Sequence, residues 1–403
     1  MKIIGIVAEY NPFHKGHAYH IEQTRKTAGE DCGIVAVMSG DFVQRGEAAV
    51  FSKYVRAEAA CRCGADLVVE LPARWALQSA ERYAEDAVSL LYRIGADTLS
   101  FGCEENSLKT IGDLAKLFLR EDFNSIVDRK WKEYPNLNYA AARQLVAEET
   151  LQRELSCLKK PNSILAVEYL KTIKKNHYRM EPILIPRKGA FHDSPEVDLY
   201  MSASAIRKKI ENRESFSDAV PENLYDIYQK EIEEERVVAD QDVYDSALLS
   251  RLQIMDSAAF EDIPDVSEDL ANRFCITLKT CRTYHDLWRQ VCCRRYPEAR
   301  IRRIGINAAL GFHRLPADTG VPYARILAFT ETGRKILKER KCRSTIPLLV
   351  NPGSVKFMGG DIQIFFEENS RAHDFYGFGI PADARAYPGE DWRRTTEYIK
   401  EER

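Results

Sequence analysis

The chain has 403 residues, of which 45% are hydrophobic and 30% charged, and its formal net charge is −3. This length and apolar content suffice for two or three domains with buried cores. No run of about 18 apolar residues occurs, which argues against a membrane span. Met1 and Lys2 lead directly into an apolar stretch too short for a signal peptide, so we expect a cytoplasmic protein.

The ten cysteines are not spaced as in disulfide-rich or zinc-binding proteins. Cys61 and Cys63 are separated by one residue, Cys292 and Cys293 are adjacent, and no CxxC pair occurs. No cysteine–histidine cluster has the spacing of zinc ligands. We therefore expect reduced thiols, many of them buried, and no metal held by side chains of the protein.

The first 210 residues alternate between strand and helix patterns. The patterns predict strands at 3–8, 33–38, 66–71, 98–101 and 180–185, and helices at 16–27, 52–63, 79–94, 164–171 and 204–211. Because these strands are almost continuously apolar and helices separate them, we expect a parallel sheet covered on both faces. Right-handed crossovers place the loops after the strands at one edge, where ligands bind. The predicted fold class is therefore α/β, with a Rossmann-like sheet.

The composition changes after Pro221. Residues 222–270 contain 15 acidic and 3 basic residues, whereas residues 271–350 contain 17 basic and 5 acidic residues. Both stretches have mainly helical patterns, and a strand pattern returns only at 321–329. We predict a catalytic domain over 1–220, a mainly helical region over 221–350, and a C-terminal segment over 351–403 that packs on the rest.

The strongest chemical signal follows the first strand, where His14-Lys15-Gly16-His17 forms an HxGH tetrad at the start of a helix. His14 and His17 lie one helical turn apart and face the same edge, where free N–H groups and the helix dipole suit phosphate. Gly16 lets a nucleotide approach the backbone closely. Two imidazoles here can donate hydrogen bonds as charge develops at an α-phosphorus. The alternative is two ordinary histidines near a helix start.

A second signal is the sequence from Met201 to Arg207. Ser202 is a plausible N-cap, and Ser204 and Arg207 lie on the same side of the following helix. Hydroxyls, N-terminal amides and a guanidinium on one turn would hold the β- and γ-phosphates or the departing pyrophosphate. The alternative is a capped surface helix with a solvated arginine.

Four further candidates follow the second predicted strand. Ser39 and Asp41 end that strand and therefore face the ligand edge. Gln44 and Arg45 could orient a carboxylate, which a bidentate guanidinium suits well. An ion pair that only stabilises the fold would give Arg45 the same pattern.

Three candidates lie near the other strand ends. Gly102 ends the fourth strand and would let an adenine or ribose pack on bare backbone. Asn162 either contacts the nucleotide or caps the helix that follows it. Arg187 follows the strand at 180–185 and could reach the phosphates.

The basic stretch at 271–350 suits a phosphodiester backbone and predicts binding that salt weakens. Its arginines include Arg294, Arg295, Arg302 and Arg303. Interleaved aromatic residues could stack on unpaired bases, namely Tyr296, Phe312 and Tyr323. The alternative is that these arginines pair with the acidic stretch at 222–270.

These motifs resemble those of a known family. Residues 14–17 and 202–207 resemble the two signatures of the HIGH-type nucleotidyltransferase superfamily. Within it, segments in matching order resemble the tRNA(Met) cytidine acetate ligase family: 5–17, 36–47, 66–72, 160–165, and Arg187 followed by His192 and Asp193. The match is weaker in the second half, where it rests mainly on 324–327.

The resemblance implies an enzyme that uses ATP and acetate to form acetyl-adenylate and pyrophosphate. It then implies transfer of the acetyl group to N4 of the wobble cytidine of elongator tRNA(Met). Mg²⁺ and the turn at 202–207 would hold the pyrophosphate. The implied ATP-site residues are Val7, Ala8, Glu9, Tyr10, Asn11, Pro12, Phe13, His14, Lys15, Gly16, His17, His20, Gly102, Asn162 and Arg187. Lys15 stands where the family commonly has asparagine, which leaves the ATP assignment in place.

Two other functions are compatible with these motifs. The first is a nucleotidyltransferase that adenylylates a small phosphate ester without RNA, which leaves the large basic region unexplained. The second is a non-catalytic RNA-binding protein, which gives no physical reason for two intact phosphate-binding motifs. No sequence feature indicates the oligomeric state.

Overall fold

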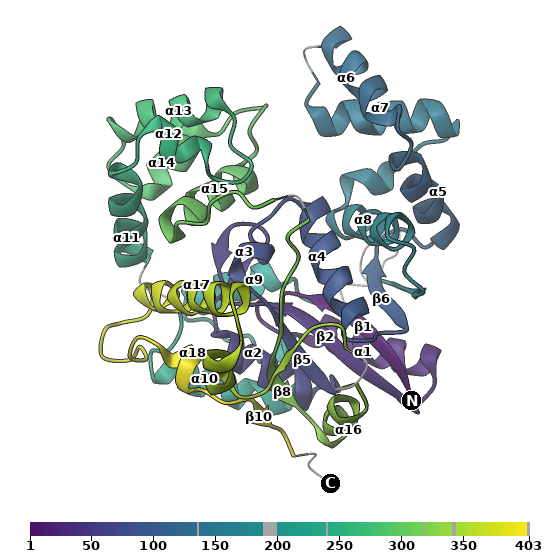
Figure 1. The fold of residues 1–403 in the computed structure, drawn as a ribbon, viewed down its shortest axis with the longest axis vertical. Coiled ribbons are helices and arrows are strands. Elements are labelled where there is room, and N and C mark those ends of the chain that lie inside the picture. The colour runs from purple at the N-terminus through teal and green to yellow at the C-terminus, as the bar shows by residue number, and fades with distance from the viewer. Residues whose placement is uncertain (135–136, 188–199, 239–240, 317, 341–343, 401–403) are drawn as a thin grey trace.

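The computed structural model describes residues 1–134, 137–187, 200–238, 241–316, 318–340 and 344–400 (Figure 1). His192 and Asp193 lie outside the residues that the structure describes. At its centre is an eight-stranded sheet with the order β10-β8-β5-β2-β1-β6-β7, in which β9 pairs with β8. These strands are β1 (Lys2–Ala8), β2 (Cys32–Ser39), β5 (Leu67–Leu71), β6 (Thr98–Cys103), β7 (Glu181–Pro186), β8 (Ala324–Phe329), β9 (Leu348–Leu349) and β10 (Glu397–Tyr398). A separate two-stranded ribbon contains β3 (Phe42–Val43) and β4 (Glu47–Ala48).

Five of these strands, β5, β2, β1, β6 and β7, are parallel neighbours, so their carboxyl ends meet at one edge. They correspond to the five strands predicted in the first half, and the predicted α/β class is confirmed. β8 joins this sheet antiparallel to β5, and β10 pairs with β8. The sheet therefore crosses the predicted boundaries near 220 and 350, and that three-part division remains a prediction.

Alternating side chains of the central strands point to opposite faces of the sheet. Ile3, Val35 and Val37 belong to one core, whereas Ile4 and Ile34 belong to the other. The second core is covered by α1 (Lys15–Ala28), α2 (Lys53–Arg62), α9 (Ala203–Glu211) and α10 (Glu222–Glu233). The first is covered by α3 (Ala73–Ala76), α4 (Ala80–Arg93), α5 (Leu108–Phe118), α8 (Pro161–Lys175), α16 (Glu331–Arg340) and α17 (Asp361–Tyr376).

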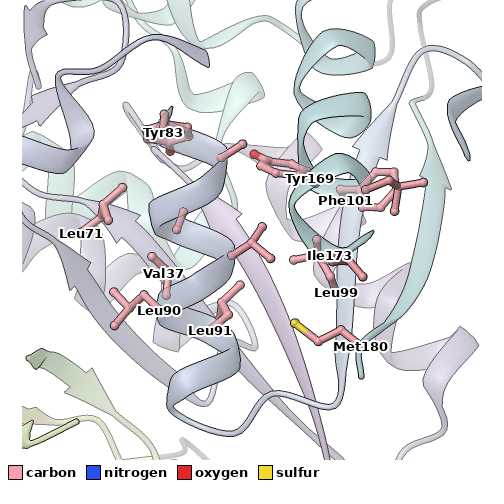
Figure 2. Packing of buried hydrophobic residues seen from close by; sticks show 14 of the residues in the cluster. Val37, Leu71, Tyr83, Leu90, Leu91, Leu99, Phe101, Tyr169, Ile173 and Met180 are labelled. Carbon is pink, nitrogen blue, oxygen red and sulfur yellow. The ribbon is translucent and has the colours of Figure 1, made fainter. Parts of the chain in front are cut away.

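Figure 2 shows how α4 and α8 pack on the sheet. Leu90 and Leu91 of α4 lie close to Val37, and Ile173 of α8 lies close to Leu99. All five side chains are buried. Each buried side chain of this size contributes about 1.5–3 kcal/mol of hydrophobic stabilisation, which fixes the sheet and therefore the position of its edge.

Two further helical groups lie apart from each other in Figure 1. One contains α6 (Phe123–Glu133) and α7 (Tyr139–Leu151), followed by η1 (Ser156–Lys159). The other has its own core and contains α11 (Gln241–Gln253), α12 (Ser257–Glu261), α13 (Glu268–Leu278), α14 (Tyr284–Val291) and α15 (Glu298–Leu310). The remaining short elements are η2 (Ser217–Ala219), η3 (Pro352–Phe357), η4 (Gly377–Gly379) and α18 (Glu390–Arg393).

The expectation that Tyr296, Phe312 and Tyr323 stack on RNA bases is wrong. Their exposed fractions are 6%, 2% and 0%, because the three rings pack in the cores of the folded protein. A base cannot reach the face of a ring that other side chains already cover. All three lie in connecting segments rather than in helices, and their side chains fill the protein's cores.

The nine cysteines within the described residues are free thiols, and five of them are buried: Cys32, Cys61, Cys103, Cys157 and Cys281. Over the same part of the chain, none of the helices combines the length and apolar character that a membrane crossing requires.

Candidate active site

The HxGH loop joins the carboxyl end of β1 to α1. The Asn11–Pro12 peptide is cis, and Tyr10 has a positive φ of 48°. The buried Asn11 side chain accepts a hydrogen bond at Oδ1 from the N–H of Val50, at 2.9 Å. The loop is therefore fixed against the segment that precedes α2.

His14 and His17 form the first turn of α1. His14 is the N-cap residue, and its Nδ1 accepts a hydrogen bond from the N–H of Gly16 at 3.0 Å. The Nδ1 atom of His17 accepts from the N–H of His14 at 3.3 Å. The two rings stack with their centroids 3.8 Å apart. Because both Nδ1 atoms are acceptors, each neutral imidazole carries its proton on Nε2 and can donate it to a ligand.

The three histidines of α1 are held in the neutral form. Desolvation, followed by the charge of Arg187, lowers the pKa of His14 from 6.5 to about 4. The same two effects lower the pKa of His20 to about 4. The pKa of His17 lies well below its ordinary value because of desolvation and the neighbouring His14. At neutral pH these imidazoles therefore act as uncharged hydrogen-bond donors.

The structure gives a reason for glycine at position 16 that the sequence did not suggest. A Cβ atom at this position would lie 2.8 Å from Cε1 of His14, which is too close for real atoms. Any larger residue would push the His14 ring off the helix start. The predicted close approach of a nucleotide remains a prediction, and the position of the His14 ring is a separate reason for glycine at this position.

The wall formed by β6, β7 and α8 contains three of the predicted residues. Arg187 follows β7, and its N–H donates to the carbonyl of Cys103 at 3.1 Å. Asn162 is not a helix cap, because Lys160 occupies that position and the Asn162 side chain donates to Glu104 Oε1 at 2.6 Å. Gly102 lies beside Arg187, where an added Cβ would make only an ordinary contact at 3.6 Å.

His20 and Glu104 complete this wall. Nε2 of His20 lies 3.0 Å from the hydroxyl of Ser100 in β6. Glu104 accepts hydrogen bonds from Asn162 and from both the N–H and the hydroxyl of Ser163. Glu104 was not among the predicted site residues, although its position directly after β6 indicates the ligand edge.

The second motif packs against the first. Ser202 caps α9 by accepting the N–H of Ala205 at 3.2 Å, and its hydroxyl lies 3.0 Å from that of Ser204. Arg207 donates to the carbonyl of Asn11 at 2.9 Å and pairs with Glu47 at 3.3 Å. Both serines are exposed, whereas the guanidinium is already engaged with the HxGH loop. The structure therefore brings the two predicted motifs together.

The four predicted substrate-binding residues at the end of β2 and after it differ in burial and in their partners. Ser39 is buried, with its hydroxyl 3.2 Å from that of Tyr83. Asp41 is buried and pairs with His373 at 2.8 Å. Gln44 donates its N–H to Glu9 at 2.7 Å, and Arg45 is exposed. Of these four predicted substrate-binding residues, Arg45 presents the most accessible side chain.

Another residue missed at the sequence level is Arg56 of α2. Its buried guanidinium donates to the carbonyls of Glu9 at 2.7 Å, Ser39 at 3.1 Å and Phe51 at 2.9 Å, and also to that of Gly40. One side chain thus fixes the ends of β1 and β2 relative to each other. An arginine in an alanine-rich helix, with no motif around it, gave no sign of this role.

The predicted RNA-binding arginines divide into two pairs. Arg294 and Arg295 are exposed, and Arg295 pairs with Asp269 at 3.5 Å. Arg302 pairs with Glu47 at 2.6 Å, and Arg303 lies 3.7 Å from Asp265 and donates to the carbonyl of Gln44. Pairing with the acidic stretch therefore occurs for Arg295 and Arg303.

Gly46 explains why Arg302 and Arg303 come so near the catalytic edge. It has a φ of 75°, and a Cβ there would lie 2.5 Å from the backbone nitrogen of Arg303. Only glycine lets the β3–β4 turn press directly on α15. These two arginines therefore join the helical group to the site.

Comparisons with known proteins agree with this geometry. The profile of the family described as HIGH Nucleotidyl Transferase matches residues 1–387. The tRNA(Met) cytidine acetate ligase of Thermosipho melanesiensis is 34% identical over 363 residues, covering 87% of this chain and 85% of the relative. That of Thermosipho africanus is 31% identical, covering 98% and 99%.

A solved structure is similar over the whole chain. The crystal structure of Thermotoga maritima TmcAL bound with alpha-thio ATP has a TM-score of 0.89 and 29% sequence identity, covering 99% of this chain and 100% of that one. Since the family profile and the relatives both extend over most of the sequence, the chain belongs to the HIGH nucleotidyl transferase family and, within it, to the tRNA(Met) cytidine acetate ligases.

Proposed function

We propose that the protein is an ATP-dependent ligase that activates acetate and transfers the acetyl group to N4 of the wobble cytidine of elongator tRNA(Met). The proposal rests chiefly on the pair of stacked neutral imidazoles at the start of α1, each of which accepts at Nδ1 and therefore carries its proton on Nε2. It is supported by relatives of that name that match most of the chain.

The first step joins acetate to AMP. A carboxylate oxygen of acetate attacks the α-phosphorus, the bond to the β-phosphate oxygen breaks, and pyrophosphate leaves. His14 and His17 would donate from Nε2 to the non-bridging oxygens, where negative charge builds. Arg187, whose positive charge lowers the pKa of both histidines, would add attraction for the phosphates.

The second step transfers the acetyl group. The exocyclic amine of cytidine attacks the acyl carbon of acetyl-adenylate, AMP leaves, and the amine loses a proton to solvent. No side chain forms a covalent bond in either step. The protein would act by positioning the reactants and by stabilising developing charge.

ATP would lie along residues 7–17 and His20 of α1, and would be flanked by Gly102, Asn162 and Arg187 of the β6, β7 and α8 wall. The solved TmcAL structure with alpha-thio ATP supports a nucleotide site in this fold. Ser202 and Ser204, exposed at the start of α9, would contact the departing pyrophosphate. Arg207 would mainly hold the HxGH loop, because its guanidinium already binds Asn11 and Glu47.

The residues present do not form a cage for Mg²⁺. Among the described residues, no group of three or more histidine, cysteine, aspartate and glutamate side chains could hold a metal ion. Glu47 and Glu104 are both engaged with other side chains near the site. A Mg²⁺ ion that enters with ATP would keep phosphate oxygens and water as its main ligands.

For RNA, the exposed Arg294 and Arg295 are better candidates than Arg302 and Arg303, which bind other parts of the protein. Replacing Arg294 with glutamine should remove one phosphate contact. The slope of the logarithm of the RNA-binding constant against the logarithm of the salt concentration should therefore become shallower by about 0.9. Replacing Arg302 should mainly lower stability, because it removes a partner of Glu47.

The direct test incubates the purified protein with ATP, labelled acetate and bulk tRNA, followed by digestion to nucleosides. The expected product is N4-acetylcytidine, formed only when all three substrates are present. Without tRNA, ATP-dependent formation of acetyl-adenylate should remain detectable. An RNA-independent product that carries AMP would instead favour a small-molecule adenylyltransferase.

A further inference from the structure

A pocket of about 610 Å³ lies away from the HxGH loop, among α2, α10, α17 and the chain from 377 to 394. α10, α17 and α18, which border it, lie together in Figure 1. Its size is within the usual range of small-molecule sites. None of the predicted ATP-site residues lines it, so the proposed acid activation leaves it unexplained.

Its aromatic side chains are available to a ligand. Phe375, Phe378 and Tyr387 line the pocket. Phe378 is 40% exposed and Tyr387 is 87% exposed, which is unusual for rings that serve only as core. Exposed rings beside a pocket are the surfaces on which nucleobases stack.

Two guanidinium groups of the pocket are available to bind an anion. The three carboxylates of the wall each have a partner: Glu231 pairs with Arg236 at 2.6 Å, Glu390 pairs with His373 at 2.9 Å, and Asp374 accepts the N–H of Gly389 at 2.7 Å. Arg371 is exposed, and Arg385 lies over the ring of Phe378 with its carbon 5.1 Å from the centroid. Within the described part of the chain, neither Arg371 nor Arg385 forms an ion pair.

The pocket shares a wall with the catalytic edge. His373 lines it, and Nδ1 of His373 lies 2.8 Å from Oδ2 of Asp41, which follows β2. Ser52 also lines it and caps α2, the helix whose Arg56 holds the carbonyls of Glu9 and Ser39. A ligand in this pocket would therefore sit against the segment that orders the proposed active site.

We propose that this pocket binds a nucleotide, with its base against Phe378 and Tyr387 and its phosphate at Arg371 and Arg385. An unstacked nucleotide of the RNA substrate and a free mononucleotide share this chemistry. Binding of a nucleotide of the RNA substrate rests on the proposed function, whereas binding of a free mononucleotide does not.

The test uses two exposed positions and one control. Tyr387→Ala removes a ring and Arg371→Gln removes a charge, while Phe357→Ala removes a ring that is 92% exposed and lies outside the pocket. The probes are the anticodon stem-loop of tRNA(Met) and free CMP or AMP, with the HxGH site saturated by a non-hydrolysable ATP analogue. Binding is measured by fluorescence anisotropy and by calorimetry.

If the RNA occupies the pocket, Tyr387→Ala should weaken stem-loop binding about tenfold or more, as expected for a lost stacking contact. Arg371→Gln should make the dependence of the stem-loop binding constant on salt shallower, by about one unit in the slope of log K against log salt concentration. Phe357→Ala should change neither quantity, and pyrophosphate release without RNA should be the same in all three variants. Loss of CMP or AMP binding in Tyr387→Ala, with stem-loop affinity unchanged, would assign the pocket to a free nucleotide.

The proposal is wrong if neither the stem-loop nor the mononucleotides depend on Tyr387 or Arg371. That result is distinct from failure of the proposed function, in which the wild-type protein itself would form no acetylcytidine.

Discussion

At the scale of single residues, His14 has two tasks that are normally separate. Its Nδ1 caps α1, which is a role usually taken by serine, threonine, aspartate or asparagine. Its Nε2 is thereby protonated and presented at the sheet edge. A short polar side chain would cap the helix equally well but would offer no donor to a phosphate.

Two substitutions of His14 separate these tasks. We expect His14→Ala and His14→Asn each to slow acid activation by about 10²–10³, because one donor to the phosphate is lost. Only the alanine variant should also lose about 1 kcal/mol of unfolding free energy, because asparagine restores the cap. Pyrophosphate release and urea denaturation measure the two effects. Full activity in His14→Asn would show that the imidazole is not needed.

The buried histidines also predict a pH dependence of stability. The pKa of His20 in the folded protein is about 4, below the ordinary 6.5, because burial disfavours its charged form. Between pH 4 and 6.5 the unfolded chain therefore binds more protons at this residue. Its contribution to stability is present above pH 6.5 and is lost as the pH falls towards 4.

This contribution is isolated by comparing the wild type with His20→Gln. Burial raises the pKa of Asp86 to about 7, so Asp86 titrates in an overlapping range with the opposite sign, but it does so in both proteins. The free energy of unfolding, measured by denaturant at several pH values, should therefore fall less steeply on acidification in His20→Gln. Parallel curves would contradict a neutral, desolvated His20.

At the scale of elements, the site depends on how α9 is attached to the HxGH loop. Arg207 makes this attachment through Asn11 and Glu47, and Glu47 also binds Arg302 of α15. The β3–β4 ribbon therefore links the two phosphate-binding motifs to the helical group. Small shifts of this ribbon should move α9 relative to α1.

Arg207→Lys tests this attachment. Lysine keeps the positive charge but cannot bind Asn11 and Glu47 as a fork, so we expect acid activation to fall about tenfold or more. The unfolding free energy should change by less than about 1 kcal/mol, because this ion pair is partly exposed. Glu47→Gln is the matched control and should be milder, since Arg207 keeps its bond to Asn11. Equal rates in Arg207→Lys and the wild type would refute the attachment role.

The sequence predicted those helices and strands whose residues show a pattern within the element itself, such as an apolar run or a capping residue. The strands β1 and β2 were found because their residues are continuously apolar, and α9 because Ser202 caps it. α17 was not found, because its sequence mixes charged and aromatic residues without a clean period. Two of its polar residues are buried through contacts far along the chain, Asn369 with Glu70 and His373 with Asp41.

The same distinction applies to the site. The HxGH and 202–207 motifs were recognisable because capping and phosphate chemistry impose residue types at fixed spacing. Arg56 and Glu104 were missed because their partners are backbone carbonyls or residues distant in sequence. Exposure could not be predicted either, so Arg302 and Arg303 seemed equivalent to Arg294 until their partners were known.

At the scale of the whole molecule, one buried lysine connects the C-terminal segment with the central sheet. Lys53 is fully buried, and its Nζ lies 2.9 Å from Glu70, 2.7 Å from Asp391 and 3.3 Å from Asp41. Burial alone would lower the pKa of Lys53, but the three carboxylates raise it well above the ordinary value. The ammonium group therefore stays charged, and it joins α18 to β5 and to the segment after β2.

Lys53→Met should therefore destabilise the entire fold. It leaves three buried carboxylates with less compensation, and removing one partner of a buried ion pair costs about 3–5 kcal/mol. The matched control is Lys26→Met, which breaks an exposed pair with Glu22 on α1 and should cost far less, because solvent screens the pair. Denaturant unfolding measures both. If the two variants lost the same amount, the buried cluster would not be what joins the C-terminal segment to the sheet. Because Asp41 also contacts His373, a large loss in Lys53→Met should be accompanied by weaker protection of α17 in hydrogen exchange.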